Sequence, residues 1–319
     1  KPPVDKPTLA DVDPLPWARY LSLLRLSVTG WALCTRDMSF QPWLTGWNTV
    51  NASSFCKYEA RLIGEDHPWV GVTMIGTVRL DMFGEAVAAV VKDGIPGSIV
   101  ECGVWRGGAS AYARGVLNSL NQSHRDVFVV DSFEGLPMAR TNLDHEFWVD
   151  TSENRAGEEM VAETFRGHRL LDDNVHFVVG YFVDSLPGAP IGEIAVLRLD
   201  GDMFESTMDI LYNLYDKVAI GGRIVIDDWH LPSAKDSVNH FRDAHGINDP
   251  YFFSGNGDFQ GAAWIKSRHV FMRREYYLGT LHAGTRVIAL QQARMQEERL
   301  QEAASRALAH DRQRQLPDP

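Results

Sequence analysis

Five short apolar runs set the strongest constraint on how this chain can fold. They span residues 98–103, 127–131, 175–180, 194–200 and 223–228, and each ends in an acidic residue or a glycine. Stretches of helical character separate most of them, at about 110–120, 156–169, 205–217 and 232–244. Continuous apolar strands that alternate with helices predict an α/β fold with a parallel sheet covered on both faces. We expect a closing pair of strands within residues 251–266.

The segments that flank this expected sheet are mostly helical in pattern. Five prolines among the first 16 residues predict an extended leader. A helix follows, because six apolar residues recur at spacings of three and four and share one face, namely Trp17, Tyr20, Leu21, Leu24, Val28 and Trp31. A second helix is expected over residues 75–93, and residues 286–308 predict a helical tail. Residues 37–60 give no clear secondary-structure prediction.

Composition narrows the class of partner. The formal net charge of −11 argues against nucleic acid and against anionic lipid, because both are bound by basic surfaces. Cys34, Cys56 and Cys102 form no C-x-x-C pair, so we expect neither a zinc site nor a disulfide framework. No apolar run reaches the roughly 18 residues of a membrane span, and no signal peptide is visible. We expect a cytoplasmic enzyme with neutral or cationic ligands.

The loop after the first expected strand reads Glu101-Cys-Gly-Val-Trp-Arg-Gly-Gly108, which is not the G-x-G-x-x-G of dinucleotide enzymes. Gly103 allows a close backbone approach, and the later glycines lead into the next helix. Glu101 stands where a pyrophosphate site would avoid negative charge. A ligand with an ammonium group and no phosphate fits better, and S-adenosylmethionine is such a ligand. The alternative is a plain turn between a strand and a helix.

Asp131 ends the second expected strand, 30 residues after Glu101. An acid at this point of a doubly wound sheet can accept hydrogen bonds from both ribose hydroxyls of a nucleoside. The residues that follow, Ser132 to Pro137, would line the adenosine pocket. The alternative is an acid that caps the next element, and the first loop favours the ribose role.

Four carboxylates follow the fourth and fifth strands. Asp200 and Asp202 end one run, and Asp227 and Asp228 end the next. Because adjacent parallel strands end at the same edge of a sheet, these side chains should share a small volume. Uncompensated carboxylates in a cleft raise one another's pKa values, and a bound cation relieves that repulsion. Oxygen ligands select a hard metal such as magnesium, or calcium or manganese.

A metal at this place suits methyl transfer to a hydroxyl. An alcohol is a poor nucleophile, and a metal that holds it lowers its pKa and fixes its direction. Asp202 is the candidate base that takes the proton, because an extended segment puts it on the same face as Asp200. The alternative is that Asp202 only supports the metal ligands. For His230, a surface or supporting role is favoured.

These residues resemble those of the macrocin O-methyltransferase family, whose members methylate sugar hydroxyls of macrolides and related antibiotics in actinobacteria. The resemblance covers about residues 17–266. It rests on Ala18-Arg-Tyr-Leu-Ser-Leu-Leu24, Thr73-Met-Ile-Gly-Thr-Val-Arg-Leu-Asp81, the loop from Glu101, Asp131-Ser-Phe-Glu-Gly-Leu-Pro137, Leu197-Arg-Leu-Asp-Gly-Asp-Met-Phe-Glu-Ser-Thr207 and Ile226-Asp-Asp-Trp229. The stretches that begin at 73, 101 and 197 are highly specific together.

The resemblance implies a Rossmann-like class I methyltransferase fold, with a seven-stranded, mostly parallel sheet and helices on both faces. It implies magnesium on Asp200, Asp227 and Asp228, with Asp202 as a candidate base. The implied contacts to S-adenosylmethionine come from Thr73, Met74, Glu101, Gly103, Arg106, Ser110, Asp131, Ser132, Gly180, Tyr181, Phe182 and Asp200. The implied reaction is methylation of a sugar hydroxyl on a glycosylated secondary metabolite.

The resemblance also suggests how the chain is divided. Residues 37–72 match a lid that closes over the cofactor and the acceptor. We therefore expect a leader, helix and lid over 1–72, a methyltransferase core over 73–267 and a helical extension over 268–319. Family members often form dimers or larger assemblies, so a homo-oligomer is expected.

Two positions depart from the family pattern and leave the acceptor open. His67 stands where an aromatic residue such as Tyr is expected, and Trp229-His230 differs from the more usual Tyr after the two aspartates. A phenolic or peptide hydroxyl is therefore an alternative acceptor. A catalytically silent S-adenosylmethionine-binding subunit is disfavoured, because an idle site has no reason to keep four acids together. A dinucleotide oxidoreductase is disfavoured by the missing glycine pattern and by Glu101.

Overall fold

The computed structural model describes residues 15–31, 38–40, 54–55, 58–147, 154–255, 260–274 and 277. Its main sheet has seven strands, β4 (Ser98–Cys102), β5 (Val127–Asp131), β6 (Val175–Val179), β7 (Ile194–Leu199), β8 (Val218–Ile226), β9 (Phe252–Phe253) and β10 (Ala262–Ile265). Their order across the sheet is β6-β5-β4-β7-β8-β10-β9. Five neighbouring strands run parallel, and β10 is antiparallel to β8 and to β9. The predicted fold class is confirmed.

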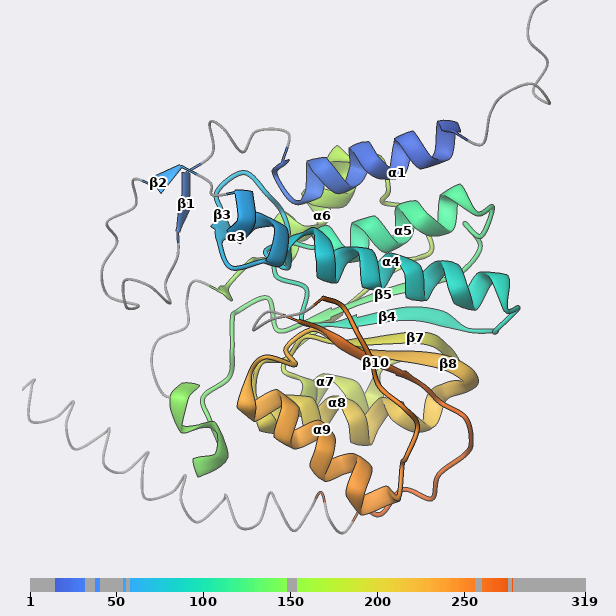
Figure 1. The fold of residues 1–319 in the computed structure, drawn as a ribbon. Helices are drawn as coiled ribbons and strands as arrows, with labels where there is room; N and C mark the ends of the chain where they lie inside the picture. Colours follow the sequence, from blue (N-terminus) through green and yellow to red (C-terminus); the bar gives the residue numbers. More distant parts are fainter. Residues whose placement is uncertain are drawn as a thin grey trace, which may run out of the picture.

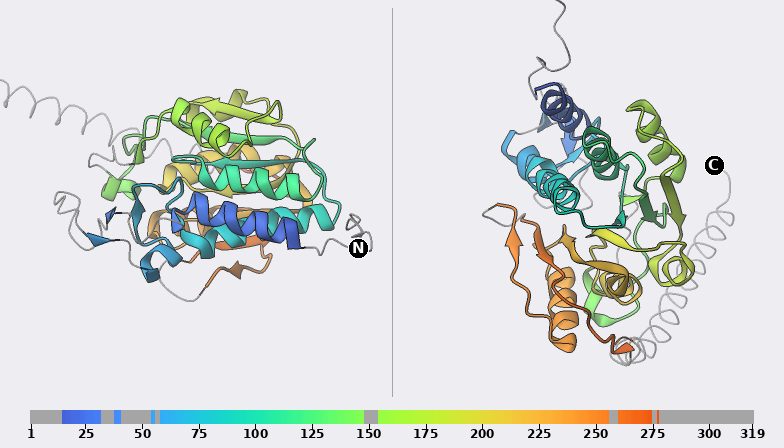
Figure 2. Two further views of the ribbon diagram at one scale, coloured as in Figure 1. Left: turned by 90° about the horizontal axis from the view of Figure 1, so that it is seen from above. Right: turned by 90° about the vertical axis from the view of Figure 1, so that its right-hand side faces the viewer.

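Helices cover both faces of the sheet (Figures 1 and 2). One face carries α4 (Gly76–Lys92), α5 (Gly108–Ser119) and α6 (Glu158–Gly167), with α1 (Leu15–Val28) packed on α5. The other face carries α7 (Phe182–Ser185), α8 (Phe204–Leu214) and α9 (Pro232–His245). Short 3-10 helices lie at η3 (Asn142–Phe147), η5 (Leu186–Gly188) and η6 (Tyr215–Lys217). No helix in the described part of the chain has the length and apolarity needed to cross a membrane.

The expected apolar face of α1 is partly confirmed. Leu24 and Val28 are buried and belong to the same core cluster as α4 and α5. Trp17 at the start of the helix keeps 51% of its surface exposed. Tyr20 and Leu21 pack against the same cluster, so the helix is attached to the core from Tyr20 onward.

The region between α1 and α4 contains more structure than the sequence indicated. It holds α3 (Tyr58–Ile63) and a three-stranded sheet of β1 (Met38–Phe40), β2 (Ser54–Phe55) and β3 (His67–Pro68), in the order β2-β1-β3. These strands are too short to produce a readable apolar alternation. The remaining residues of the expected lid, and the predicted tail helix at 286–308, lie outside the described residues.

A close approach between two loops at the carboxyl edge of the sheet requires glycine. Gly103, directly after β4, has φ +89°, and a Cβ atom built on it would lie 1.6 Å from the carbonyl oxygen of Asp200. This contact brings the loop after β4 against the loop after β7. A side chain at position 103 would push the two loops apart and open the edge where ligands bind in such sheets.

Gly103→Ala should lower the free energy of unfolding by about 3 kcal/mol, because backbone strain and a clash with a carbonyl group add together. Urea unfolding measures this loss. Gly94→Ala is the matched control, since Gly94 has a similar φ of +67° but no atom within 4 Å of the position that a Cβ atom would take. The control should lose only about 1 kcal/mol. Equal losses in the two variants would contradict the role of the close approach.

Candidate active site

A cavity of about 490 Å³ opens at the carboxyl edge of the parallel strands. This size lies in the range of small-molecule sites. Most of the predicted cofactor-binding residues line it, namely Thr73, Met74, Glu101, Gly103, Asp131, Ser132, Tyr181, Phe182 and Asp200. The predicted base and metal ligands Asp202, Asp227 and Asp228 line the same cavity. The structure therefore brings residues from six separate parts of the sequence to one place.

Arg106 lies outside the cavity lining and holds a neighbouring segment. Its Nη1 donates hydrogen bonds to the carbonyl oxygens of Pro68, Trp69 and Gly71, at 2.9, 3.1 and 3.0 Å. The guanidinium also stacks over the ring of Trp105, 4.1 Å from its centroid. Arg106 thus holds residues 68–71 against the start of α5. Trp105, on which it stacks, lines the cavity.

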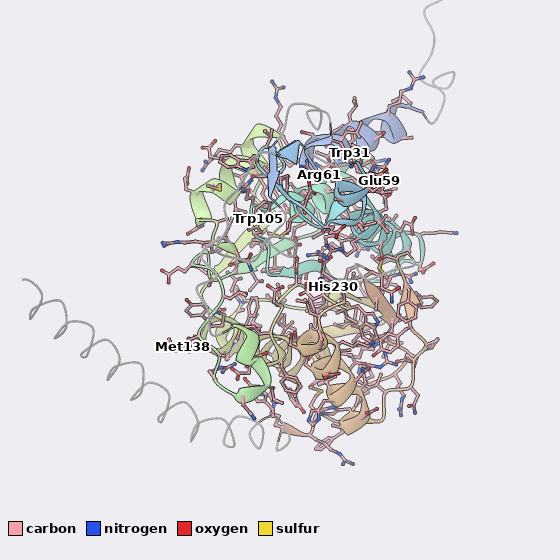
Figure 3. The ribbon with its side chains drawn as sticks, turned by 60° about the vertical axis from the view of Figure 1, so that its left-hand side comes forward. Trp31, Glu59, Arg61, Trp105, Met138 and His230 are labelled. Atoms are coloured by element: carbon pink, nitrogen blue, oxygen red, sulfur yellow. The ribbon has the colours of Figure 1, made fainter. Side chains whose placement is uncertain are left out.

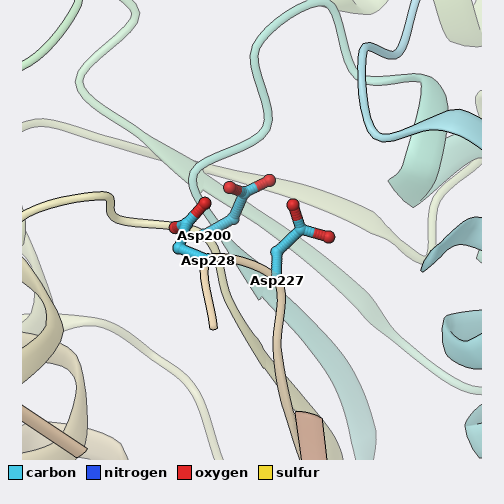
Figure 4. A group of neighbouring side chains, drawn as sticks. All are labelled: Asp200, Asp227 and Asp228. Atoms are coloured by element: carbon cyan, nitrogen blue, oxygen red, sulfur yellow. The ribbon is translucent and has the colours of Figure 1, made fainter. Parts of the chain in front are cut away.

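Three carboxylates at the ends of β7 and β8 form a compact group. One oxygen each of Asp200, Asp227 and Asp228 can be chosen so that all three lie within 4.8 Å of one another. Figure 4 shows the three side chains pointing to the same side of the sheet edge. Asp227 and Asp228 are buried, and Asp200 keeps 24% of its side chain exposed. An all-oxygen donor set of this size fits a hard divalent cation such as magnesium.

Arg198, a fully buried residue of β7, lies behind this group. Its Nη1 lies 2.5 Å from Oε1 of Glu101 and 2.7 Å from Oδ2 of Asp200, and its Nη2 lies 2.5 Å from Oδ1 of Asp227. The strand register pairs Glu101 with Arg198, so both side chains point to the same face. Ser110, whose predicted contact with the cofactor stays a prediction, donates its hydroxyl to the other oxygen of Glu101.

Arg79 provides a second buried cation from α4. Its Nη1 pairs with Oδ2 of Asp227. Its Nη2 and Nε donate to the carbonyl oxygens of Gly64 and Ile75, at 3.3 and 3.2 Å. Sequence reasoning missed Arg79, because it falls within an ordinary amphipathic helix. Arg198 did leave a signal, since it interrupts an otherwise apolar strand.

The two arginines only partly balance the acids. Five carboxyl groups meet at this edge, those of Glu101, Asp200, Asp202, Asp227 and Asp228, against two guanidinium groups. Burial, opposed by its arginine partner, raises the pKa of Glu101 to about 7. Burial and the neighbouring carboxylates likewise raise the pKa values of Asp202 and Asp228. The carboxyl groups are therefore undercompensated, and a bound cation would favour their ionised forms.

Asp202 adopts a left-handed backbone conformation, with φ +56°. Its N–H donates to Oδ2 of Asp228 at 2.9 Å, and its carbonyl oxygen accepts from the hydroxyl of Ser233 at 2.8 Å. These bonds hold the backbone of Asp202 beside the acidic group while its half-buried side chain lines the cavity.

Asp131 makes the capping contacts weighed from the sequence and also lies in the cavity wall. Its Oδ1 accepts the N–H of Phe133 and its Oδ2 accepts the N–H of Val104, each at 2.8 Å, so it does organise the local turns. It also lines the cavity. The hydroxyl of Ser132 is directed to the carbonyl oxygen of Gly135, at 2.7 Å.

Gly180 does not line the cavity itself but positions the residues that do. Its φ of +129° turns the chain after β6, so that Tyr181 and Phe182 reach the cavity. Across the cavity lies His230, a lining residue whose pKa is lowered to about 4 by burial and by Arg79. Figure 3 shows His230 below Trp105. His230 is therefore part of the cavity wall rather than a surface residue.

Comparison with known proteins identifies the chain. The family model described as Macrocin-O-methyltransferase (TylF) matches residues 31–266. The chain belongs to this family. Mycinamicin III 3''-O-methyltransferase from Micromonospora griseorubida is 40% identical over 217 residues, which cover 66% of this chain and 84% of the relative. Demethyldecarbamoylnovobiocin O-methyltransferase from Streptomyces niveus is 39% identical and covers 69% and 86%.

A solved structure agrees with this assignment. The O-methyltransferase NovP superposes with a TM-score of 0.71 at 35% identity, covering 79% of this chain and 100% of that chain. The protein is therefore an S-adenosylmethionine-dependent O-methyltransferase. The cavity described above lies where a doubly wound sheet binds its ligands.

Arg198→Met should lower the free energy of unfolding by about 3–5 kcal/mol, because it leaves buried carboxylates without their counter-ion. Chemical unfolding followed by circular dichroism measures the change. Arg166→Met is the control, since Arg166 pairs only with the exposed Glu159 and Glu163 on α6. The control should leave the free energy of unfolding close to that of the wild type, because ion pairs between exposed groups contribute little. A similarly small loss in Arg198→Met would contradict the central role of this guanidinium.

Proposed function

We propose that this enzyme transfers the methyl group of S-adenosylmethionine to a sugar hydroxyl of a glycosylated secondary metabolite, with magnesium as a required metal. The observation that carries the proposal is the group of three carboxylates within 4.8 Å in the same cavity as Asp131. The relatives support the sugar acceptor. One of them, 43% identical over 197 residues, is a rhamnosyl-tetracenomycin-C 4'-O-methyltransferase from Streptomyces olivaceus.

The cofactor would lie along the ends of β4, β5 and β6. Asp131 would accept hydrogen bonds from the ribose hydroxyls, since it is the acid at the end of β5. Tyr181 and Phe182 would border the adenine. Thr73, Met74 and Gly103 would border the methionine part, with Glu101 behind them as a partly compensated acid. Arg106 and Ser110 would contribute indirectly, through residues 68–71 and through Glu101.

Asp200, Asp227 and Asp228 would hold the metal at the ends of β7 and β8. Bound magnesium would lower the pKa of an acceptor hydroxyl and hold that hydroxyl in line with the methyl group. The charges support this arrangement. Around the metal ligands, carboxyl groups outnumber guanidinium groups, and Asp131 adds a further acid to the cavity. A divalent cation and a positively charged cofactor would each reduce this excess.

The chain's own residues would then position and deprotonate the acceptor. Asp202 is our proposed base, because its side chain lines the cavity while its backbone is fixed by Asp228 and Ser233. Of the two positions that differ from the family pattern here, His230 lines the cavity and bears on the choice of acceptor, whereas Trp229 is buried in the core cluster outside the lining. His230 would present a neutral imidazole at the wall of the cavity.

Asp228→Asn should abolish magnesium-dependent methyl transfer, because it removes a charged oxygen ligand. We choose Asp228 rather than Asp227 because Asp227 also pairs with two arginines, so its replacement would disturb more than the metal site. The experiment is methyl transfer to a panel of glycosylated acceptors with and without magnesium, beside calorimetric binding of S-adenosylhomocysteine. Full activity of Asp228→Asn, or wild-type activity after chelation of metal, would refute the metal assignment.

Asp202→Asn distinguishes a role of Asp202 as the catalytic base from a role in supporting the metal ligands. If Asp202 is the base, kcat should fall about 10²- to 10⁴-fold while the Kd for magnesium stays near that of the wild type. Calorimetric titration with magnesium, run beside steady-state kinetics, measures both quantities. A loss of magnesium affinity that accounts for the loss of activity would assign Asp202 to metal support instead.

A further inference from the structure

Residues 270–274 and 277 lie beyond the part of the chain that the family model matches, yet they pack back onto the core. Val270, Met272 and Tyr277 contact the apolar cluster on the α8 and α9 face of the sheet. The N–H of Arg273 donates to Nε2 of His245 in α9, at 3.0 Å. This segment is therefore attached to the catalytic core by both apolar and polar contacts.

Tyr277 makes two specific contacts with α8. Its ring stacks on Tyr212, with centroids 4.9 Å apart and an interplanar angle of 26°. Its hydroxyl donates to Oδ1 of Asp209, at 2.5 Å. Burial and the charge of Asp209 raise the pKa of Tyr277, so the hydroxyl stays protonated and can act as the donor.

Asp209 also pairs with Arg140, which lines the cavity. Its other oxygen, Oδ2, lies 2.5 Å from Nη2 of Arg140. Oε2 of Glu205, one turn earlier on α8, accepts from both Nε and the backbone N–H of Arg140, at 2.9 and 2.8 Å. Arg140 and Asp209 both line the cavity, and Arg140 keeps 23% of its side chain exposed. Among the described residues, Nη1 of Arg140 has no hydrogen-bond partner.

The segment around Asp144, which follows Arg140 in the sequence, is also fixed to α8. Oδ1 and Oδ2 of Asp144 accept the N–H groups of Phe204 and Glu205, at 2.6 and 3.0 Å, so this carboxylate caps the N-terminus of α8. The loop that follows Asp131 is thus held on α8 through its own Asp144 and through Glu205 and Asp209 of the helix. Of these contacts, only Asp209 is shared with the C-terminal segment.

We propose that Tyr277 is a positioning residue for the active site, which fixes Arg140 through Asp209 at the adenosyl end of the cavity. The C-terminal segment would thereby complete the cofactor site. The choice of the adenosyl end rests on the proposed placement of the ribose at Asp131, because Arg140 belongs to the loop that follows this residue. Tyr277 orients Asp209, Asp209 orients the guanidinium of Arg140, and Nη1 of Arg140 donates to the bound cofactor.

The test is calorimetric binding of S-adenosylhomocysteine to the full chain. Tyr277→Phe keeps the stacked ring and removes only the hydroxyl, so it should raise the Kd about fivefold with little change in Tm. Arg140→Met should raise the Kd by at least as much. In the Arg140→Met background, Tyr277→Phe should have no further effect, because the hydroxyl acts through Arg140.

Tyr251→Phe is the matched control. The hydroxyl of Tyr251 bonds Asn239, and its ring contacts the same apolar cluster without lining the cavity. It should leave the Kd unchanged. An unchanged Kd in Tyr277→Phe, or an equal effect with and without Arg140, would overturn the inference. An effect on the KM of the acceptor alone would also overturn it. Failure of the wild type to bind S-adenosylhomocysteine would instead refute the proposed function, and the inference with it.

Discussion

The buried guanidinium of Arg198 is the interaction on which the rest of the site depends. Strand alternation and register place it beside Glu101 on the face that α4 covers, and its donors also reach Asp200 and Asp227. Without it, several carboxylates would share a buried volume with little compensation, and each would cost several kcal/mol to ionise. With it, the ends of β4, β7 and β8 form one connected unit. The same cation therefore stabilises the fold and sets the spacing of the candidate metal ligands.

The negative charge that Arg198 does not compensate makes the cavity attractive to cations. Arg79 offsets part of it from α4 and also bonds the carbonyl oxygens of Gly64 and Ile75, so the acidic group is linked to the segment that borders the cavity. A site that is only partly neutralised by fixed cations attracts mobile ones. A divalent metal and a sulfonium cofactor are both such cations. The excess of carboxylates in the cavity is therefore compatible with the cationic cofactor of a methyltransferase.

The sequence allowed the sheet and the acidic edge to be predicted, but not the cations that organise them. Continuous apolar runs marked β4 to β7 to within a residue or two, and the acids at their ends had to meet because parallel strands share an edge. Arg79 and Arg140 were missed, because neither differs in sequence context from a solvated surface arginine. The hydroxyl of Tyr277 reaches Asp209 only through tertiary packing. In the segment before α4, strands of two or three residues carry no periodic signal.

The most direct measurement is a crystal structure of the protein with S-adenosylhomocysteine and manganese, which replaces magnesium and scatters anomalously. We predict an anomalous peak bounded by the carboxylates of Asp200, Asp227 and Asp228, with the ribose on Asp131 and the sulfur atom facing the metal across the cavity. A complex with bound cofactor and no peak among these three carboxylates, or a metal bound elsewhere, would contradict the account.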